Sequence, residues 1–301
     1  MEFNFNKVAI LYGGKSLERE ISLMSGQAVY QALINKNINA ELFDPSEQDI
    51  FELKKQGFDV AFVVLHGGSG ENGEIQSCLE MMAIPYTGSD SRACVLSDDK
   101  YLTKLLWEKE NLPIADYVLV NNESKLEACE QLGFPLFMKP TREGSSIGVH
   151  KIKDRTELLE VYTKLSTQYT EVIAETFLSG GEFSCPIIGS EALPVVKIEP
   201  SNEFYDYEAK YLRNDTVYSC PAGLSEEDER YAKQICLQAF NSLGCSNWGR
   251  VDFMRGVDGK FYLLEVNAAP GMTTHSLVPK SAFEYGLNFE QLCLRILSYA
   301  T

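Results

Sequence analysis

The feature that most constrains this fold is a pair of apolar strands on either side of Asp258-Gly259, in the stretch GRVDFMRGVDGKFYLLEVNAAPG (residues 249–271). An Asp-Gly pair between two such strands is a strong signal for a β-hairpin with a two-residue loop. Because side chains alternate along a strand, that loop gives one face of the hairpin two opposed pairs, Asp252 with Glu265 and Arg250 with Asn267. The other face then carries Val251, Phe253, Leu264 and Val266.

Two directly opposed carboxylates destabilise a hairpin unless a positive charge lies between them. Asp252, Glu265 and Asn267 offer only oxygen ligands, which suits Mg²⁺, an ion that commonly bridges nucleotide phosphates. The alternative is a solvated strand face on which Arg250 offsets the acidic charge. The hairpin alone leaves both interpretations open.

The first third of the chain alternates strand and helix signals. Apolar runs occur at Val8–Tyr12, Ala40–Phe43 and Val60–Leu65, with a helical stretch from about Glu18 to Asn35. This pattern predicts an α/β domain with a small, Rossmann-like parallel sheet. Loops at the carboxyl ends of parallel strands commonly bind ligands, so the loop at His66 is one candidate site.

The turn after the first strand, in AILYGGKS (residues 9–16), ends in the last four letters of a nucleotide-binding phosphate loop. The full motif needs another glycine where this chain has Ala9, because several backbone amides must surround the phosphates. We therefore interpret Gly13-Gly14 as a tight turn and expect phosphates to bind elsewhere.

The character of the sequence changes near Ser97 and, less sharply, near Glu182. These changes predict a first domain of residues 1–96, followed by two α+β units of residues 97–182 and 183–301.

A Gly/Ser-rich loop follows an apolar strand in FPLFMKPTREGSSIGVHK (residues 134–151). Lys139 closes the strand and can supply a point charge, while amides and hydroxyls of residues 144–148 can cover a triphosphate. The alternative is a mobile surface hairpin.

Two later segments carry weaker signals. Glu175 and Glu182 flank an apolar connector and could hydrogen-bond an adenine and a ribose, although an interdomain linker with solvated acids would look the same. The segment FYDYEAKYLRND (residues 204–215) is long, irregular and aromatic, which is typical of a lid over a site. A disordered surface loop is the alternative.

Composition excludes several classes of partner. A net charge of -16 repels nucleic acid and anionic lipid, and no apolar run reaches the ~20 residues of a membrane helix. Eight cysteines form no Cys-x-x-Cys pair, and the start Met-Glu-Phe-Asn is unlike a secretory leader. We therefore expect a cytoplasmic protein with reduced thiols.

In their order along the chain, these pieces resemble the D-alanine:D-alanine ligase family of the ATP-grasp superfamily. The similarity runs from Val8 to about Leu297 and takes in LYGGKSLEREISL, LHGGSGENGEIQ, PYTGS, DDKYLTK, KPTREGSSIGV, YDYEAKY, CPAG, GRVDFM and LLEVNAAPGMTTHSLVP. It implies a two-part ATP-grasp fold after the first domain, with ATP between the central and C-terminal units. It also implies that ATP phosphorylates the carboxylate of one D-alanine and that the amine of a second attacks the acyl phosphate. The product would be the dipeptide used for peptidoglycan.

The resemblance implies a role for each matching residue. The phosphates of ATP would be bound by Lys100, Lys139, Glu143, Gly144, Ser145, Ser146 and Lys210. Adenine and ribose would be bound by Glu175, Phe177, Leu178 and Glu182. Two Mg²⁺ ions, for which Mn²⁺ could substitute, would be held by Asp252, Glu265 and Asn267, with Glu265 bridging them.

The substrate contacts are implied in the same way. The first D-alanine would meet Glu18, Ser145 and His66, with Glu18 on its ammonium group. The oxyanion formed by the amine attack would be stabilised by Arg250 and the amide of Gly271. The carboxylate of the second D-alanine would be held by Ser276 and Leu277. The lid residues Lys210 and Tyr211 would close over the site, with Tyr211 meeting Glu18 and Ser145.

Some questions stay open at this level. Ala268-Ala269 stands where many relatives have Thr followed by Ser or Leu, from which we expect only a small change in loop packing. A D-alanine:D-lactate ligase or another ATP-grasp carboxylate-amine ligase is the first alternative, although EAKY in the lid resembles the dipeptide form. A non-catalytic module that binds nucleotide or amino acid is the second. The family suggests a homodimer, and the sequence does not assign the acceptor of the amine proton.

Overall fold

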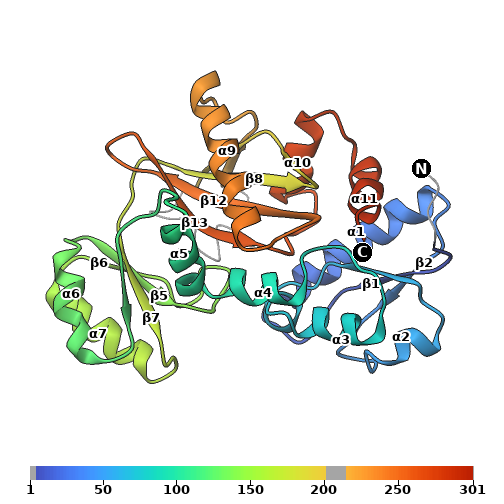
Figure 1. The fold of residues 1–301 in the computed structure, drawn as a ribbon, viewed down its shortest axis with the longest axis horizontal. Coiled ribbons are helices and arrows are strands. Elements are labelled where there is room, and N and C mark those ends of the chain that lie inside the picture. The colour runs from blue at the N-terminus through green and yellow to red at the C-terminus, as the bar shows by residue number, and fades with distance from the viewer. Residues whose placement is uncertain (1–4, 201–214, 301) are drawn as a thin grey trace.

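The computed structural model describes residues 5–200 and 215–300, and their strands form three sheets (Figure 1). The first sheet lies in the N-terminal part of the chain, and the second and third follow it. None of the helices within those ranges has the length and apolar character needed to cross a membrane.

The first sheet is parallel and has the strand order β2-β1-β3. Its strands are β1 (Val8–Leu11), β2 (Ala40–Phe43) and β3 (Val60–Val63). The connecting helices are α1 (Arg19–Asn35), α2 (Glu52–Lys55), the short 3₁₀ helix η1 (Gly68–Gly70) and α3 (Glu74–Met82). Every residue of β1 and β3 is buried, as in parallel strands covered on both faces. The predicted Rossmann-like sheet is therefore confirmed.

The Gly13-Gly14 turn uses its backbone amides within the protein. The amide of Gly13 donates to Ser22 Oγ at 2.8 Å, and the amide of Gly14 donates to Asp44 Oδ1 at 3.1 Å. Both glycines have φ near +75°, and a Cβ on Gly13 would lie 2.4 Å from the Asp44 carboxylate. The turn therefore lacks the open amides of a phosphate loop, which confirms its interpretation as a tight turn.

The second sheet is antiparallel and has the order β4-β7-β5-β6. Its strands are β4 (Tyr117–Val120), β5 (Leu136–Pro140), β6 (His150–Ile152) and β7 (Val172–Thr176). One face is covered by α6 (Leu126–Gln131) and α7 (Arg155–Ser166), after the short η2 (Glu123–Lys125). Leu136 and Met138 point into that core, so alternation turns Phe137 and Lys139 to the opposite face.

The third sheet has the order β11-β10-β8-β12-β13, and β9 pairs with β8. Its strands are β8 (Glu182–Ile188), β9 (Glu191–Ala192), β10 (Val196–Glu199), β11 (Val217–Ser219), β12 (Trp248–Arg255) and β13 (Phe261–Asn267). The remaining helices are α4 (Ser91–Asp98), α5 (Lys100–Lys109), α9 (Glu226–Ser242), α10 (Leu277–Glu284) and α11 (Phe289–Leu297). Helix α9 and Trp107 of α5 cover its apolar face, and the indole of Trp107 donates to Ala239 O at 3.1 Å.

The predicted hairpin is confirmed in part. Strand β12 pairs with β13 so that Asp252 faces Glu265 and Arg250 faces Asn267. A bulge then shifts the register after Asp252, so Phe253 faces Leu263 and Leu264 becomes the extra residue of β13.

Two predictions for the hairpin are wrong, one because of this bulge and one because the loop is longer than two residues. Leu263 is the fully buried core residue, whereas Leu264 is half-buried on the polar side of the sheet. The loop is longer than Asp258-Gly259, because residues 256–260 connect the strands and the Gly256 amide donates to Lys260 O at 2.8 Å.

A shared core joins the first sheet to the C-terminal helices. Side chains of β1, β3 and α1 pack with Trp248, Met272 and residues of α10 and α11, and the rings of Phe62 and Trp248 lie 6.4 Å apart. Helix α11 therefore lies beside α1, although they are at opposite ends of the chain (Figure 1). This packing brings the loops of the first sheet against the strand ends of the third.

Candidate active site

A cavity of about 530 Å³ lies between the second and third sheets. Every residue predicted to bind ATP lines it, apart from Ser145 and from Lys210, which lies outside the described residues: Lys100, Lys139, Glu143, Gly144, Ser146, Glu175, Phe177, Leu178 and Glu182. The cavity lies within the size range of nucleotide and small-molecule sites.

One side of this cavity is apolar, and most of its residues were missed by the sequence reasoning. Ala115, Phe137, Val149, Met254 and Leu264 line it together with Phe177 and Leu178. The rings of Phe137 and Phe177 lie 5.6 Å apart, and Lys151 Nζ lies 4.0 Å from the centre of the Phe177 ring. Such a wall suits the faces of a flat aromatic base. The alternation in FPLFMK was a signal for Phe137, since it points away from the core beside Lys139.

Glu175 lies buried at one side of the cavity between two lysines. Its carboxylate lies 3.0 Å from Lys104 Nζ and 2.7 Å from Lys139 Nζ. Burial alone would raise the pKa of Glu175, but the two ammonium groups lower it to about 2. Burial also lowers the pKa of the fully enclosed Lys104, against the opposite effect of Glu175. Lys104 was not predicted, although it lies one helical turn after Lys100 on α5.

The Gly/Ser loop between β5 and β6 links the cavity to the first domain. Ser145 and Ser146 both have positive φ, at 52° and 61°, a conformation that is uncommon for residues other than glycine. Ser145 Oγ donates to the carboxylate of Glu18, and Lys100 Nζ donates to Glu143 O at 2.6 Å. The loop is therefore fixed from both sides by charged residues that the sequence singled out.

A second, small cavity of about 50 Å³ adjoins the first. It brings together five predicted site residues, Glu18, Ser145, Arg250, Glu265 and Asn267. Glu71 and Asp98 also line it and were not predicted, although Glu71 belongs to the HGGSGENG motif and Asp98 precedes Asp99-Lys100. Burial and the charge of Glu18 raise the pKa of Glu71 to about 8, and burial raises the pKa of Asp98 to about 6.

The opposed carboxylates of the hairpin are each paired with a positively charged side chain. Asp252 accepts from Ser184 Oγ at 2.6 Å and lies 3.1 Å from Arg250 Nη2, while Glu265 lies 3.3 Å from Lys100 Nζ. Asn267 Oδ1 accepts the amide of Ala269 at 3.0 Å. Within residues 5–200 and 215–300, no group of three or more His, Cys, Asp or Glu side chains is gathered in a way that could hold a metal ion.

The remaining predicted residues that the structure describes line neither cavity. His66 is buried, with its two ring nitrogens 2.8 Å from Ala269 O and 3.0 Å from Ser25 Oγ. Gly271 lies against Ser276, whose Oγ would be 2.8 Å from a Cβ on Gly271. The side chain of Leu277 packs in a small core with Val196 and Ile198. Tyr211 lies outside the described residues.

Comparisons with known proteins place this chain in a family. Family models described as D-ala D-ala ligase N-terminus and C-terminus match residues 41–89 and 106–298. The D-alanine–D-alanine ligase B of Chromobacterium violaceum is 50% identical to this chain over 97% of each sequence. The chain belongs to the D-alanine–D-alanine ligase family.

Solved structures of this family have the same fold. A D-alanine–D-alanine ligase of Bacillus anthracis matches with a TM-score of 0.87 and 31% identity, covering 97% of this chain and 96% of its own. Its complex with ATP matches with a TM-score of 0.86 and 30% identity, covering 99% of this chain and 97% of its own. The predicted α/β and ATP-grasp architecture of the ligase is therefore confirmed, while the domain boundaries stay predictions.

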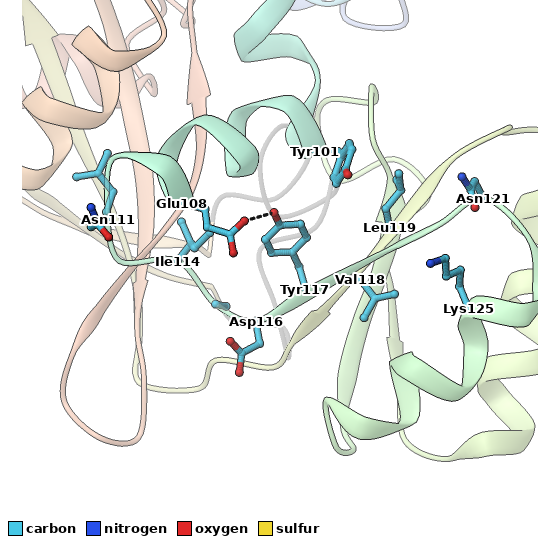
Figure 2. A pocket seen from close by; sticks show the side chains of 12 residues that line it. Tyr101, Glu108, Asn111, Ile114, Asp116, Tyr117, Val118, Leu119, Asn121 and Lys125 are labelled. Carbon is cyan, nitrogen blue, oxygen red and sulfur yellow. Dashed lines mark hydrogen bonds between the residues drawn. The ribbon is translucent and has the colours of Figure 1, made fainter.

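The ligase also has a hollow of about 790 Å³ along β4 and the end of α5 (Figure 2). Tyr101 and Tyr117 line it, and the hydroxyl of Tyr117 donates to Glu108 at 3.1 Å (Figure 2). None of the predicted site residues between 5 and 200 or between 215 and 300 lines this hollow, so the two adjoining cavities are the better candidate for the active site.

Proposed function

We propose that this ligase joins two D-alanine molecules to D-alanyl-D-alanine for peptidoglycan, at the expense of ATP and through an acyl phosphate. One observation carries the proposal beyond family membership. The nucleotide-sized cavity and the small acidic cavity share Lys100, Glu143, Gly144 and Glu265 in their walls. A terminal phosphate in the first cavity therefore lies next to an amino acid in the second, as phosphoryl transfer to a carboxylate requires.

The larger cavity binds ATP. Adenine lies against the apolar wall of Phe137, Phe177, Met254 and Leu264, near Leu178. Glu182 binds the ribose, and Lys100, Lys139 and the loop of residues 143–146 bind the phosphates. The carboxylate of Glu175 already holds Lys104 and Lys139, so it orients the phosphate-binding lysine besides lying near adenine. The lid residue Lys210 completes the phosphate site.

Asp252, Glu265 and Asn267 fit a magnesium site. Their donor atoms are all oxygens on adjacent strands, and in this structure two bases, Arg250 and Lys100, neutralise the two carboxylates. Two Mg²⁺ or Mn²⁺ ions bound there, with Glu265 shared, would neutralise the phosphate charge. A cation in this position would also balance the charge of the two carboxylates in place of Arg250 and Lys100. These two side chains would then be able to bind the substrates.

The smaller cavity binds the first D-alanine. Glu18 receives its ammonium group, with Ser145 and the lid residue Tyr211 beside it. A carboxylate oxygen of this D-alanine attacks the γ-phosphorus, and ADP leaves.

The second D-alanine approaches from the start of α10. Ser276 and the backbone amide of Leu277 hold its carboxylate, as helix N-termini hold anions. Its amine attacks the carbonyl carbon of the acyl phosphate, and phosphate leaves with the transferred carboxylate oxygen. Arg250 and the Gly271 amide stabilise the oxyanion, and one such donor is commonly worth about 3 kcal/mol.

The test is product formation with both amino acceptors. Purified protein with ATP, Mg²⁺ and D-alanine should release one phosphate for each D-alanyl-D-alanine, and D-lactate should compete poorly at neutral pH. Preferred use of D-lactate at neutral pH would instead support a D-alanine:D-lactate ligase. ATP binding without turnover would support the non-catalytic module.

We also propose that the protein works as a homodimer in the cytoplasm. The family resemblance supports the dimer. The eight free cysteines suit a reducing compartment. Light scattering on a size-exclusion column should give twice the chain mass of 33.7 kDa, and a mass of one chain would contradict the dimer.

A further inference from the structure

A closed chain of hydrogen bonds connects α1 and the loop after β3 to the segment after β13. The amide of Met272 donates to Ser25 Oγ at 3.1 Å, and Ser25 Oγ lies 3.0 Å from His66 Nε2. His66 Nδ1 lies 2.8 Å from Ala269 O. All four residues are buried, and the bonds to Ala269 and Met272 each join residues more than 200 positions apart in the sequence.

The two backbone groups fix the donor at each end of this chain of hydrogen bonds. A carbonyl oxygen only accepts, so Nδ1 of His66 must carry a proton for Ala269. A backbone amide only donates, so Ser25 Oγ accepts from Met272 and has its own proton left for Nε2. Burial lowers the pKa of His66, and Arg250 acts in the same direction while Glu18 opposes it, so the neutral ring is favoured. A neutral ring that donates from Nδ1 has a bare Nε2, which accepts from Ser25 Oγ, so His66 is in the Nδ1-H form.

The two anchored backbone groups lie on either side of Pro270-Gly271. Ala269 is held on one side and Met272 on the other, and within the described residues the Gly271 amide donates to no acceptor. We infer that Ser25 and His66 are positioning residues that aim the Gly271 amide at the reacting carbonyl, an inference that rests on the proposed function. Both ring nitrogens are occupied in this role, so His66 acts through the loop rather than by binding D-alanine.

The main chain of His66 reaches the other end of the reacting centre. Its carbonyl oxygen accepts from Ser16 Oγ, which in turn accepts the amide of Glu18 at 3.1 Å. His66 thus helps to position two groups. Its main chain holds Glu18, whose carboxylate we propose binds the ammonium group of the first D-alanine, and its ring holds the loop whose Gly271 amide we propose stabilises the oxyanion. A change in Ser25 or in the ring disturbs only the second of these.

The first test separates turnover from binding. Ser25→Ala removes the acceptor of Met272 and the donor to Nε2, so the loop is held on one side only. We expect kcat to fall at least about tenfold, because a misplaced donor loses part of the roughly 10²–10³-fold effect of an oxyanion donor, with the KM for ATP unchanged. An unchanged kcat in a folded Ser25→Ala variant would overturn the inference.

Ser22→Ala is the matched control. Ser22 lies one turn earlier on α1, is equally buried and also makes two hydrogen bonds, from the Gly13 amide and to Val64 O. Neither of these reaches the segment after β13. We expect a similar loss of thermal stability in both variants, but a kcat within about twofold of wild type for Ser22→Ala only. Equal losses of kcat would assign Ser25 to stability alone.

A double-mutant cycle tests whether both residues act through one loop. In His66→Ala both ring hydrogen bonds are lost, the one to Ala269 O and the one to Ser25 Oγ. If the inference holds, the double variant loses no more kcat than the worse single variant, because the loop needs both anchors and the loss of either already lets the Gly271 amide turn away from the reacting carbonyl. Multiplied losses would contradict it.

A spectroscopic measurement keeps the inference testable even if the variants fail to fold. The chain has three histidines, so ¹⁵N correlation spectra of the wild-type protein resolve each ring. We expect one neutral ring in the Nδ1-H form, assigned to His66 by its loss in His66→Ala or by ordinary backbone assignment. An Nε2-H form or a charged ring at neutral pH would overturn the inference. Absence of dipeptide synthesis by the wild type would contradict the proposed function instead and leave this spectrum unchanged.

Discussion

At Glu175, two lysine side chains converge on one buried carboxylate. We predict that Glu175→Gln lowers the free energy of unfolding by about 3 kcal/mol, because removal of one partner leaves Lys104 buried without its counter-charge. Lys104→Met should restore much of the loss in the double variant. Denaturant unfolding of the two single variants and the double variant measures this coupling, and simply additive losses would show that the pair is not coupled.

The same carboxylate should make stability depend on acid pH. The pKa of Glu175 is about 2 in the folded protein and near 4.5 for an ordinary glutamate, so the unfolded chain takes up its proton first as pH falls. Its contribution is therefore complete above about pH 4.5 and is lost between pH 4.5 and about 2. Denaturation curves should fall more steeply over this range for wild type than for Glu175→Gln. Parallel curves would contradict the low pKa.

Glu18 offers a prediction about substrate use. It is buried and bonded to Ser145, and its charge faces the small cavity. We expect Glu18→Gln to raise the KM for D-alanine by tenfold or more and to spare ATP binding, since a hydrogen bond between charged groups contributes about 1.5–3 kcal/mol. Glu20→Gln is the control, because it removes the same charge from an exposed position two residues away. An unchanged KM for D-alanine in Glu18→Gln would refute the assignment.

Among the elements, the hairpin β12–β13 shows where sequence reasoning succeeds and where it stops. Alternation and the Asp-Gly signal correctly paired Asp252 with Glu265, because the bulge adds one residue to β13 and so offsets the one-residue shift that the longer loop introduces. The bulge at Leu264 could not be predicted, because it depends on how the sheet packs and twists rather than on a local residue preference. The bulge places an extra leucine in the wall of the larger cavity, where we propose that ATP binds.

The bulge places the adjacent residues Leu263 and Leu264 in different surroundings. Leu263 is fully buried in the core, so Leu263→Ala should cost about 3 kcal/mol of stability, as for other large-to-small core changes. Leu264→Ala should cost little stability and instead raise the KM for ATP several-fold, because it removes part of the apolar wall. Thermal unfolding and ATP titrations of the two variants provide the comparison. A large loss of stability in Leu264→Ala, together with a raised KM for ATP in Leu263→Ala, would contradict the pairing of β12 with β13.

At the scale of the whole molecule, the order of the units along the chain was readable from motifs, but their contacts were not. The Gly/Ser loop and the hairpin acids were recognised from local patterns, and Glu18 from the family resemblance. The meeting of this loop, Glu265 and Glu18 at two adjoining cavities follows from the shared core of β1, α1, Trp248 and α11. Glu71, Asp98 and Lys104 escaped prediction because only tertiary packing buries them beside other charges. Ser25 is a similar case, since a serine inside a helix gives no signal for a partner at residue 272.

Transfer of an oxygen atom tests the central claim most directly, because the two cavities meet where phosphate and carboxylate would react. The ligase is supplied with ATP, Mg²⁺ and D-alanine labelled with ¹⁸O in its carboxylate, and the phosphate and dipeptide are analysed by mass spectrometry. An acyl phosphate requires one ¹⁸O atom in the released phosphate for every D-alanyl-D-alanine formed. Dipeptide formed with unlabelled phosphate, or phosphate released without dipeptide, would contradict the account.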